Sequence, residues 1–198
     1  MISEYKEIFK VANPQDYQLR LMQESDLQLV LEWRNSERVR SNMYTDHIIS
    51  LDEHKSWFLH IENDESVSYH ICEYNRKPIG VVYFTNIDRL SKKSYWGFYL
   101  GDINVPMGSG SIMGFIALSY AFKSLDIRKL CSEVFSFNKK AINFHEKLGF
   151  QQEGYFMKHI LKQGKYEDIV TLALFKDDWL SRNSDLYNLV FRLESNHG

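Results

Sequence analysis

The chain has 198 residues, a formal net charge of −2, a sequence pI near 6.4 and 44% hydrophobic residues. This length suits one substantial core, and the mixed charges exclude a strongly basic protein that binds nucleic acid or an anionic membrane. The longest nearly unbroken apolar run, residues 115–122, is far below the ~18 residues of a membrane-spanning helix. Cys72 and Cys131 lie far apart in strand-like runs. They indicate reduced core thiols, so with no signal-peptide core we expect a cytoplasmic protein without a metal site.

The first half of the chain predicts strands and helices that end in an antiparallel meander. The expected elements are a strand at 17–22, helices at 26–34 and 51–63, and strands at 68–74, 78–86 and 94–100. Alternating apolar and polar residues indicate the strands, and Ser25 is expected to cap the first helix. A polar loop is expected between the two helices, reaching to about residue 50.

After residue 100 the pattern changes to alternating strands and helices. The expected elements are a helix at 108–125, a strand at 128–136, a short helix after Asn138, strands at 150–161 and 166–175 joined at 162–165, and one or two short helices at 177–194. The helix at 108–125 is apolar nearly all round, so we expect it to be buried against a sheet. Together the two halves predict a mixed α+β fold. Because no repeat or linker appears, we expect one domain at 1–178 and a helical tail at 179–198.

The run from Asn138 to Phe150 predicts a capped helix with a histidine on its inner side. Asn138 is a good N-cap, and Gly149 can adopt the left-handed conformation that ends a helix of about 10 residues. One stripe of this helix faces the protein and consists of Ala141, Phe144, His145 and Leu148. A histidine in such a stripe is either a packed residue bonded to a backbone carbonyl or a catalyst. The helix alone favours the packed residue.

A glycine-rich segment, Gly108-Ser109-Gly110-Ser111, follows a strand and opens the buried helix. Free backbone amides and the positive end of the helix dipole would meet there, which suits a phosphate group. A plain loop explains the same residues equally well. The segment is not a P-loop, which needs Gly-Lys-Ser/Thr, nor a dinucleotide fingerprint, which needs a third glycine at Met113.

This order of parts resembles the Gcn5-related N-acetyltransferase (GNAT) superfamily over about residues 17–178. The resemblance implies a mixed, mostly antiparallel sheet of about seven strands, splayed between its central strands and flanked by helices. It also implies acetyl-CoA as co-substrate, with its pyrophosphate on the glycine-rich segment. The residues expected to contact acetyl-CoA are Tyr99, Leu100, Gly101, Gly108, Ser109, Gly110, Ser111, Asn138, Ala141, Phe144 and Lys147. Val105 departs from the superfamily pattern, which has Gln or Arg there, so a polar side chain is lost while the amides remain.

The resemblance also implies two catalytic residues, His145 and Glu133. His145 stands where the superfamily commonly has tyrosine, in the setting Tyr-Glu-Lys-x-Gly-Phe. Acetyl transfer needs a neutral amine, a stabilised oxyanion and a thiolate that leaves charged or receives a proton. We expect His145 to give that proton as an imidazolium, and Glu133 to accept the amine proton directly or through water. For Glu133, an outward-facing residue on an alternating strand is the alternative.

Segments 31–44 and 51–58 resemble the subgroup that acetylates the 4-amino group of a UDP-linked deoxy sugar in pseudaminic acid biosynthesis. The residues implied in acceptor binding are Arg34, Asn35, Arg38, Arg40, Met43, Tyr44, His54 and Trp57. Three guanidinium groups in one turn-rich segment can bind a diphosphate, and aromatic rings can stack on uracil or the sugar. A solvated helix end, with arginines paired to neighbours such as Glu37, is the alternative.

Three functions stay open. The first is acetyl-CoA-dependent N-acetylation of an amino-sugar nucleotide by direct attack. The second is acetylation of a protein N-terminal amine or a polyamine, which an acidic cleft would favour. The third is an acyl-CoA-binding regulatory module without turnover, which the histidine at position 145 and Val105 suggest. We expect the first, with a small-molecule amine as partner, no nucleic acid or membrane, and a monomer or homodimer.

Overall fold

The computed structural model describes residues 13–191. After a 3-10 turn at Pro14–Asp16, the strands are β1 (Tyr17–Leu21), β2 (Ser68–Tyr74), β3 (Lys77–Asp88), β4 (Lys93–Leu100), β5 (Lys129–Phe135), β6 (Gln151–Lys162) and β7 (Lys165–Phe175). The α-helices are α1 (Leu27–Asn35), α2 (Glu37–Arg40), α3 (Leu51–Ile61), α4 (Ser109–Ser119), α5 (Lys139–Lys147) and α6 (Lys176–Phe191). No described helix is long and apolar enough to cross a membrane.

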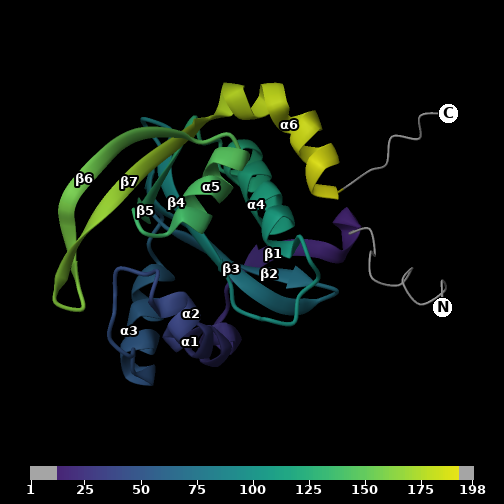
Figure 1. The fold of residues 1–198 in the computed structure, drawn as a ribbon. Helices are drawn as coiled ribbons and strands as arrows, with labels where there is room; N and C mark the ends of the chain where they lie inside the picture. The colour runs from purple at the N-terminus through teal and green to yellow at the C-terminus, as the bar shows by residue number, and fades with distance from the viewer. Residues whose placement is uncertain (1–12, 192–198) are drawn as a thin grey trace, which may run out of the picture.

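All the described strands form one sheet, in the order β1-β2-β3-β4-β5-β7-β6. Neighbouring strands are antiparallel except β4 and β5, which are parallel. Helices α1, α2 and α3 lie on one face, and α4 and α5 cover the other, with α6 beside α4 (Figure 1). The predicted mixed, mostly antiparallel sheet of about seven strands is therefore confirmed.

The two faces of the sheet have separate cores. The larger core joins the sheet to α4, α5 and α6, and it includes the fully buried rings of Phe84, Phe122 and Trp179. The smaller core, with Val30, Phe58 and others, lies under α1 and α3. Because Trp179 is buried in the larger core, α6 packs onto the body of the protein.

Strands β4 and β5 pair over only three positions and then diverge. The pairs are Lys93 with Lys129, Ser94 with Leu130 and Tyr95 with Cys131. Beyond them, β4 stays bonded to β3 and β5 stays bonded to β7, with no further pairing between β4 and β5 in the described chain. This is the expected splay, and it leaves backbone groups along both inner edges free to bond a ligand.

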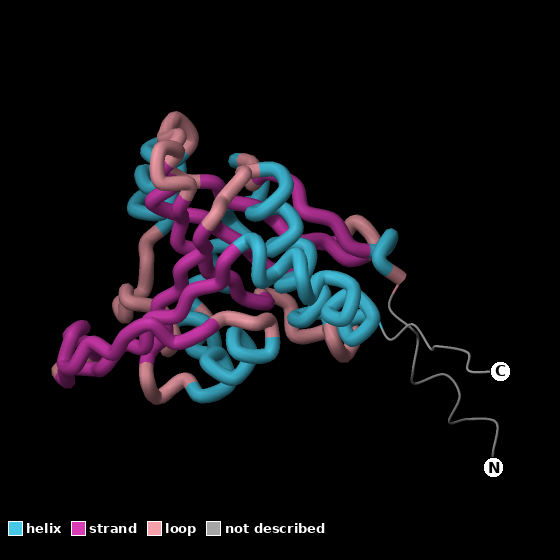
Figure 2. The backbone as a smooth tube through the Cα atoms, turned by 90° about the horizontal axis from the view of Figure 1, so that it is seen from above, coloured by secondary structure: helices cyan, strands magenta, loops and turns pink. Residues whose placement is uncertain are grey.

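The long β6–β7 hairpin projects past the other strands at one end of the sheet (Figures 1 and 2). Its turn consists of Gln163 and Gly164, both with positive φ (48° and 77°), which is the geometry of a tight two-residue hairpin turn. The projecting end of the hairpin lies next to the segment after α2 and forms hydrogen bonds to Met43 and Asp46.

Two predicted helices and one predicted loop differ from the observed elements. Ser25 does not cap α1, because it lies inside a 3-10 turn at Glu24–Asp26 that is closed by a capping box between Gln23 and Asp26. The predicted polar loop contains α2, one turn of helix that is too short for a periodic pattern. The helix predicted at 108–125 is α-helical only to Ser119 and ends in a π-helical turn at Tyr120–Ser124. The tail forms one 16-residue helix, α6, within the described residues.

Candidate active site

A cavity of about 620 Å³ lies on the α1–α3 face of the sheet, beside the splay. Its floor comes from β2, β3, β4 and β5, and its walls come from α1, α3 and residues 42–49. The residues that line it are Val30, Arg34, Asn42, Met43, Tyr44, Thr45, Ile49, Glu53, His54, Trp57, Tyr69, Val81, Tyr83, Thr85, Asn86, Tyr95, Trp96, Tyr99 and Glu133. Its volume is typical of a pocket for a small-molecule ligand.

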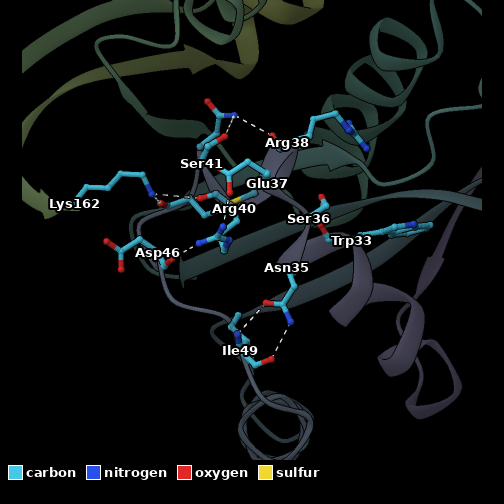
Figure 3. A network of polar contacts seen from close by, with 12 residues as sticks. Trp33, Asn35, Ser36, Glu37, Arg38, Arg40, Ser41, Asp46, Ile49 and Lys162 are labelled. Carbon is cyan, nitrogen blue, oxygen red and sulfur yellow. Dashed lines mark hydrogen bonds and ion pairs between the residues drawn. The ribbon is translucent and has the colours of Figure 1, made fainter.

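Five of the eight predicted acceptor residues line this cavity: Arg34, Met43, Tyr44, His54 and Trp57. The other three hold the chain around it. The side chain of Asn35 bonds both the carbonyl and the amide of Ile49, at 2.9 Å each. Arg38 donates to the carbonyl of Gly101 at 2.7 Å. Arg40 donates to the carbonyl of Asp46 at 2.6 Å and pairs with Glu37 (Figure 3).

Arg34 brings a positive charge into the cavity. Within residues 13–191, its buried Nη1 atom has no hydrogen-bond partner, and no carboxylate forms an ion pair with it. Burial lowers the pKa of Arg34, and the tyrosines Tyr99, Tyr83 and Tyr69 oppose that shift. The guanidinium remains charged because its ordinary pKa is so high. Arg34 therefore presents an unsatisfied N–H donor to a ligand that enters the cavity.

Aromatic rings form a continuous row along the cavity wall. His54 stacks on Trp57 (centroids 4.9 Å apart), Trp57 meets Tyr69 edge to face, and Tyr69 stacks on Tyr83 at 5.4 Å. His54 is only 4% exposed, and burial lowers its pKa, so its ring is neutral near pH 7. The tyrosines at 69, 83 and 95 and Trp96 were missed from the sequence. The alternation of Tyr95, Gly97 and Tyr99 along β4 is the signal that places tyrosines on this face.

Glu133 lines the cavity from β5. It forms a hydrogen bond with Tyr44, which belongs to the wall formed by residues 42–49. The Tyr44 hydroxyl donates to Glu133 Oε2 at 2.6 Å, and its ring lies edge-on to Phe135. Burial and then the neighbouring carboxylate raise the pKa of Tyr44, so the phenol stays protonated as the donor. Glu133 therefore faces the cavity, and its role as the base that accepts the amine proton stays a prediction.

His145 lies on the other side of the splay, in a cage of aromatic rings. It is 4% exposed and contacts Trp96 and Phe150 edge to face, with centroids 5.5 and 5.0 Å away. Its Nδ1 lies 2.7 Å from the carbonyl of Ala141, and its Nε2 lies 2.9 Å from Ser132 Oγ. Since a carbonyl only accepts, Nδ1 carries the proton, and Nε2 of the neutral ring accepts from the Ser132 hydroxyl.

Burial lowers the pKa of His145 to about 4, against an opposing contribution from the Ala141 carbonyl. The ring therefore carries little positive charge near pH 7. Proton delivery to sulfur by His145 stays a prediction, but an imidazolium is scarce at that pH, and the neutral ring has no proton on Nε2 that it could pass on through Ser132.

The glycine-rich segment forms the N-terminus of α4, as predicted. Gly108 is the N-cap, with φ of +92°, a conformation that favours glycine. The Ser109 amide donates to the Pro106 carbonyl, and its hydroxyl bonds that carbonyl and the Tyr17 hydroxyl, so its side chain is already engaged. The amides of Gly108 and Gly110 have no backbone carbonyl partner among the described residues. These two amides and the helix end fit a pyrophosphate group.

The remaining predicted cofactor residues lie around the splay in different environments. The backbone of Tyr99, Leu100 and Gly101 lies on the diverging half of β4 or directly after it, whereas the Tyr99 ring lines the acceptor-side cavity. The Asn138 side chain caps α5 by accepting from the Ala141 amide at 3.1 Å. Phe144 packs on Phe98 and close to Gly114, while Lys147 is exposed. Acetyl-CoA would supply an activated acetyl group at this place. No cluster of metal-ligating side chains occurs in the part of the chain that the structure describes.

Comparison with known proteins identifies the family. The model of the acetyltransferase (GNAT) domain matches residues 19–171. The chain is 22% identical over 166 residues to the spermidine N(1)-acetyltransferase of Vibrio cholerae, covering 83% of this chain and 96% of that protein. It is 29% identical over 125 residues to the acetyltransferase PseH of Campylobacter jejuni, covering 63% and 76%.

Among solved structures, the spermidine N-acetyltransferase of Vibrio cholerae in complex with CoA and spermine superposes with a TM-score of 0.79. That match has 22% sequence identity and covers 84% of this chain and 99% of the other. It supports the same fold. With the family match over most of the chain, the splayed sheet and the glycine-led helix, the protein belongs to the GNAT acetyltransferase family and is an acetyl-CoA-dependent N-acetyltransferase.

Proposed function

We propose that this enzyme acetylates the primary amine of a small molecule that also carries an anionic group, and that this acceptor is a nucleotide-linked amino sugar. The observation that carries the proposal is Arg34, a guanidinium in the cavity with a buried Nη1 and no hydrogen-bond partner there among residues 13–191. The resemblance of segments 31–44 and 51–58 to the pseudaminic acid subgroup supplies the sugar nucleotide as the class. The 4-amino group of a UDP-linked deoxy sugar is the finer form of the same proposal.

An uncompensated charge in a cavity favours a ligand of opposite charge. Leaving a buried ionic group without a partner costs free energy, and a phosphate oxygen would satisfy the Arg34 donors in a charge-assisted hydrogen bond. Arg40 and the buried Lys162 lie close enough to Arg34 to add to the positive potential. A fully cationic acceptor would meet repulsion at this end of the cavity.

The aromatic wall and the volume suit the rest of such a ligand. A cavity of about 620 Å³ lies within the usual range for small-molecule sites. The row formed by Trp57, Tyr69 and Tyr83 offers ring faces and edges to a nucleobase or to the apolar face of a sugar. The buried His54 Nε2 lacks a partner among the described residues and can accept or donate one more hydrogen bond.

The proposed reaction is direct attack of the amine on the thioester carbonyl of acetyl-CoA. A carbon–nitrogen bond forms, the carbon–sulfur bond breaks, and CoA leaves as a thiolate, while the amine proton passes to Glu133. Tyr44 orients the Glu133 carboxylate through its 2.6 Å hydrogen bond. The Ser132–His145 pair lies on the opposite side of the splay, and we propose that the Ser132 hydroxyl turns from His145 Nε2 to donate a hydrogen bond to the departing thiolate, while the ring stays neutral.

A polyamine is the second candidate acceptor. The similarity to spermidine N(1)-acetyltransferases extends over more of the chain than the similarity to PseH does. In addition, two carboxylates, Glu53 and Glu133, line the cavity and would favour a cation. Arg34 argues against this acceptor, because its charge lies in the same cavity without a carboxylate paired to it in the described chain.

The test is a thiol-release assay with acetyl-CoA and a panel of acceptors: a UDP-linked 4-amino-deoxy sugar, spermidine and an N-terminal peptide. We expect the highest kcat/KM with the sugar nucleotide. Arg34→Met should raise the KM for that acceptor by about tenfold or more, the size expected for a lost hydrogen bond to a charged group.

Arg89→Met is the control, because Arg89 is an exposed arginine that does not line the cavity. It should leave the acceptor KM within about twofold of wild type. A higher kcat/KM for spermidine, together with an unchanged or lower spermidine KM in Arg34→Met, would establish the polyamine candidate instead.

A further inference from the structure

Lys162 is a buried lysine that joins the β6–β7 hairpin to the segment after α2. It is the last residue of β6 and only 7% exposed. Its Nζ atom donates to the carbonyl of Met43 at 2.7 Å and to that of Arg40 at 3.3 Å (Figure 3). No carboxylate of the described chain forms an ion pair with it, although the face of the Phe135 ring lies 5.5 Å from Nζ.

A second contact reinforces the same connection. The amide of Gln163, the next residue, donates to Asp46 Oδ2 at 2.9 Å, and this bond lowers the pKa of Asp46. Arg40 in turn bonds the Asp46 carbonyl. The hairpin therefore holds the chain at Arg40, Met43 and Asp46 at once.

The held segment carries cavity residues and is fixed at its far end as well. The double hydrogen bond between Asn35 and Ile49 closes that end (Figure 3). Within this held segment, Met43 and Tyr44 line the cavity, and Tyr44 reaches Glu133. The position of both side chains therefore depends on how the segment is held.

A lysine at this place is costly unless its donors are needed. Burial lowers the pKa of Lys162, and Arg34 and Arg40 lower it further, while Asp46 and Glu37 act in the opposite direction. An apolar residue could fill the same space without this desolvation penalty, but it could not bond the two carbonyls. The ammonium is thus best explained by the carbonyls that it holds.

We propose that Lys162 is a positioning residue for the acceptor site, which it completes by fixing residues 40–46 from the β6–β7 hairpin. The proposal rests on the proposed function in one respect, namely that the cavity receives the acceptor. Lys162 does not line the cavity itself, so it acts through the backbone of Met43 and Arg40.

The experiment compares Lys162→Met with Lys165→Met. Lys165 is the control because it lies on the same hairpin, its side chain is 75% exposed, and it pairs with Glu167 on the hairpin itself. In Lys162→Met we expect the acceptor KM to rise about tenfold, the effect of losing charge-assisted hydrogen bonds, with the KM for acetyl-CoA within about twofold of wild type. Lys162→Arg, which keeps donors and charge, should recover most of the loss. Lys165→Met should behave as wild type.

Hydrogen exchange provides a readout that does not depend on the identity of the acceptor. The amides of residues 41–49 should exchange at least about tenfold faster in Lys162→Met than in wild type, while those of α5 stay unchanged. If no acceptor in the panel is turned over, the proposed function fails, and the exchange data still decide the role of Lys162. Should Lys162→Met not fold, Asp46→Ala removes the neighbouring contact and should change the same amides. Unchanged exchange in residues 41–49, or an acceptor KM within about twofold of wild type, would overturn the proposal.

Discussion

Replacing His145 by phenylalanine should flatten the pH dependence of stability. The folded protein keeps the imidazole neutral, with a pKa of about 4 instead of the ordinary 6.5, because the ring is buried among aromatic side chains. As the pH falls through 6.5, the unfolded chain takes up a proton at this position that the folded chain does not. The unfolded state is thereby favoured, and the loss continues until about pH 4. At about 1.4 kcal/mol for each pKa unit, the loss reaches about 3 kcal/mol.

The assay is urea unfolding of wild type and His145→Phe between about pH 7.5 and pH 4. Wild type should lose about 3 kcal/mol more than the variant over this range. His70, whose pKa burial also lowers to about 4, titrates in both proteins and cancels in the comparison. His159→Phe removes an exposed histidine and serves as the control. Parallel curves for wild type and His145→Phe, or an imidazole that titrates near pH 6.5 by NMR, would refute the argument.

The same variant tests the catalytic prediction. If the neutral Ser132–His145 pair supports the departing sulfur, His145→Phe should lower kcat at saturating substrates without removing a limb near pH 6.5 from the pH profile. Wild-type turnover across the whole pH range would show that His145 has no part in the chemistry. Loss of a limb near pH 6.5 would instead support an imidazolium donor.

Two further substitutions test the other side of the reaction and the cofactor loop. Glu133→Gln should lower kcat at least about tenfold, because an amide cannot accept the amine proton, whereas Tyr44→Phe keeps the carboxylate and should lower kcat less; a kcat within about twofold of wild type in Glu133→Gln would exclude this residue as the base. Gly108→Ala should cost about 1–2 kcal/mol of stability through its positive φ and weaken acetyl-CoA binding by calorimetry. Gly110→Ala, at a helical position with ordinary contacts, is the control for stability, and an equal loss of stability in the two variants would show that the conformation of Gly108 does not matter.

Local signals in the sequence predicted most of the fold. Asn138 and Gly149 mark the ends of a strongly amphipathic helix, and α5 lies between them with the predicted cap. The first helix was less well predicted. Ser25 has the chemistry of a cap, but Arg20 bonds Asp26 and stabilises a 3-10 turn there. That contact depends on a neighbouring strand and leaves no mark in the local pattern.

The acceptor site was predicted in part, and the reason lies in one backbone turn. The sequence places Arg34, Arg38 and Arg40 within one short segment, but α1 ends at Asn35 and Ser36 takes an extended conformation with ψ of 140°. A new helix then begins, so the three arginines do not share a face. Only Arg34 enters the cavity, while the other two bond backbone carbonyls.

The hairpin contact also has a consequence for how the protein is made. Lys162 and Met43 are separated by 119 positions in the chain, so the segment that carries Met43 and Tyr44 leaves the ribosome long before its anchor does. Contacts between such distant residues form late, because the loop that they close has a large entropy cost. A nascent or truncated chain that ends before the hairpin would thus contain Arg34, Trp57 and the glycine-led helix but would lack the contact that shapes the acceptor wall. Competence for the acceptor would be among the last properties that the chain gains during synthesis.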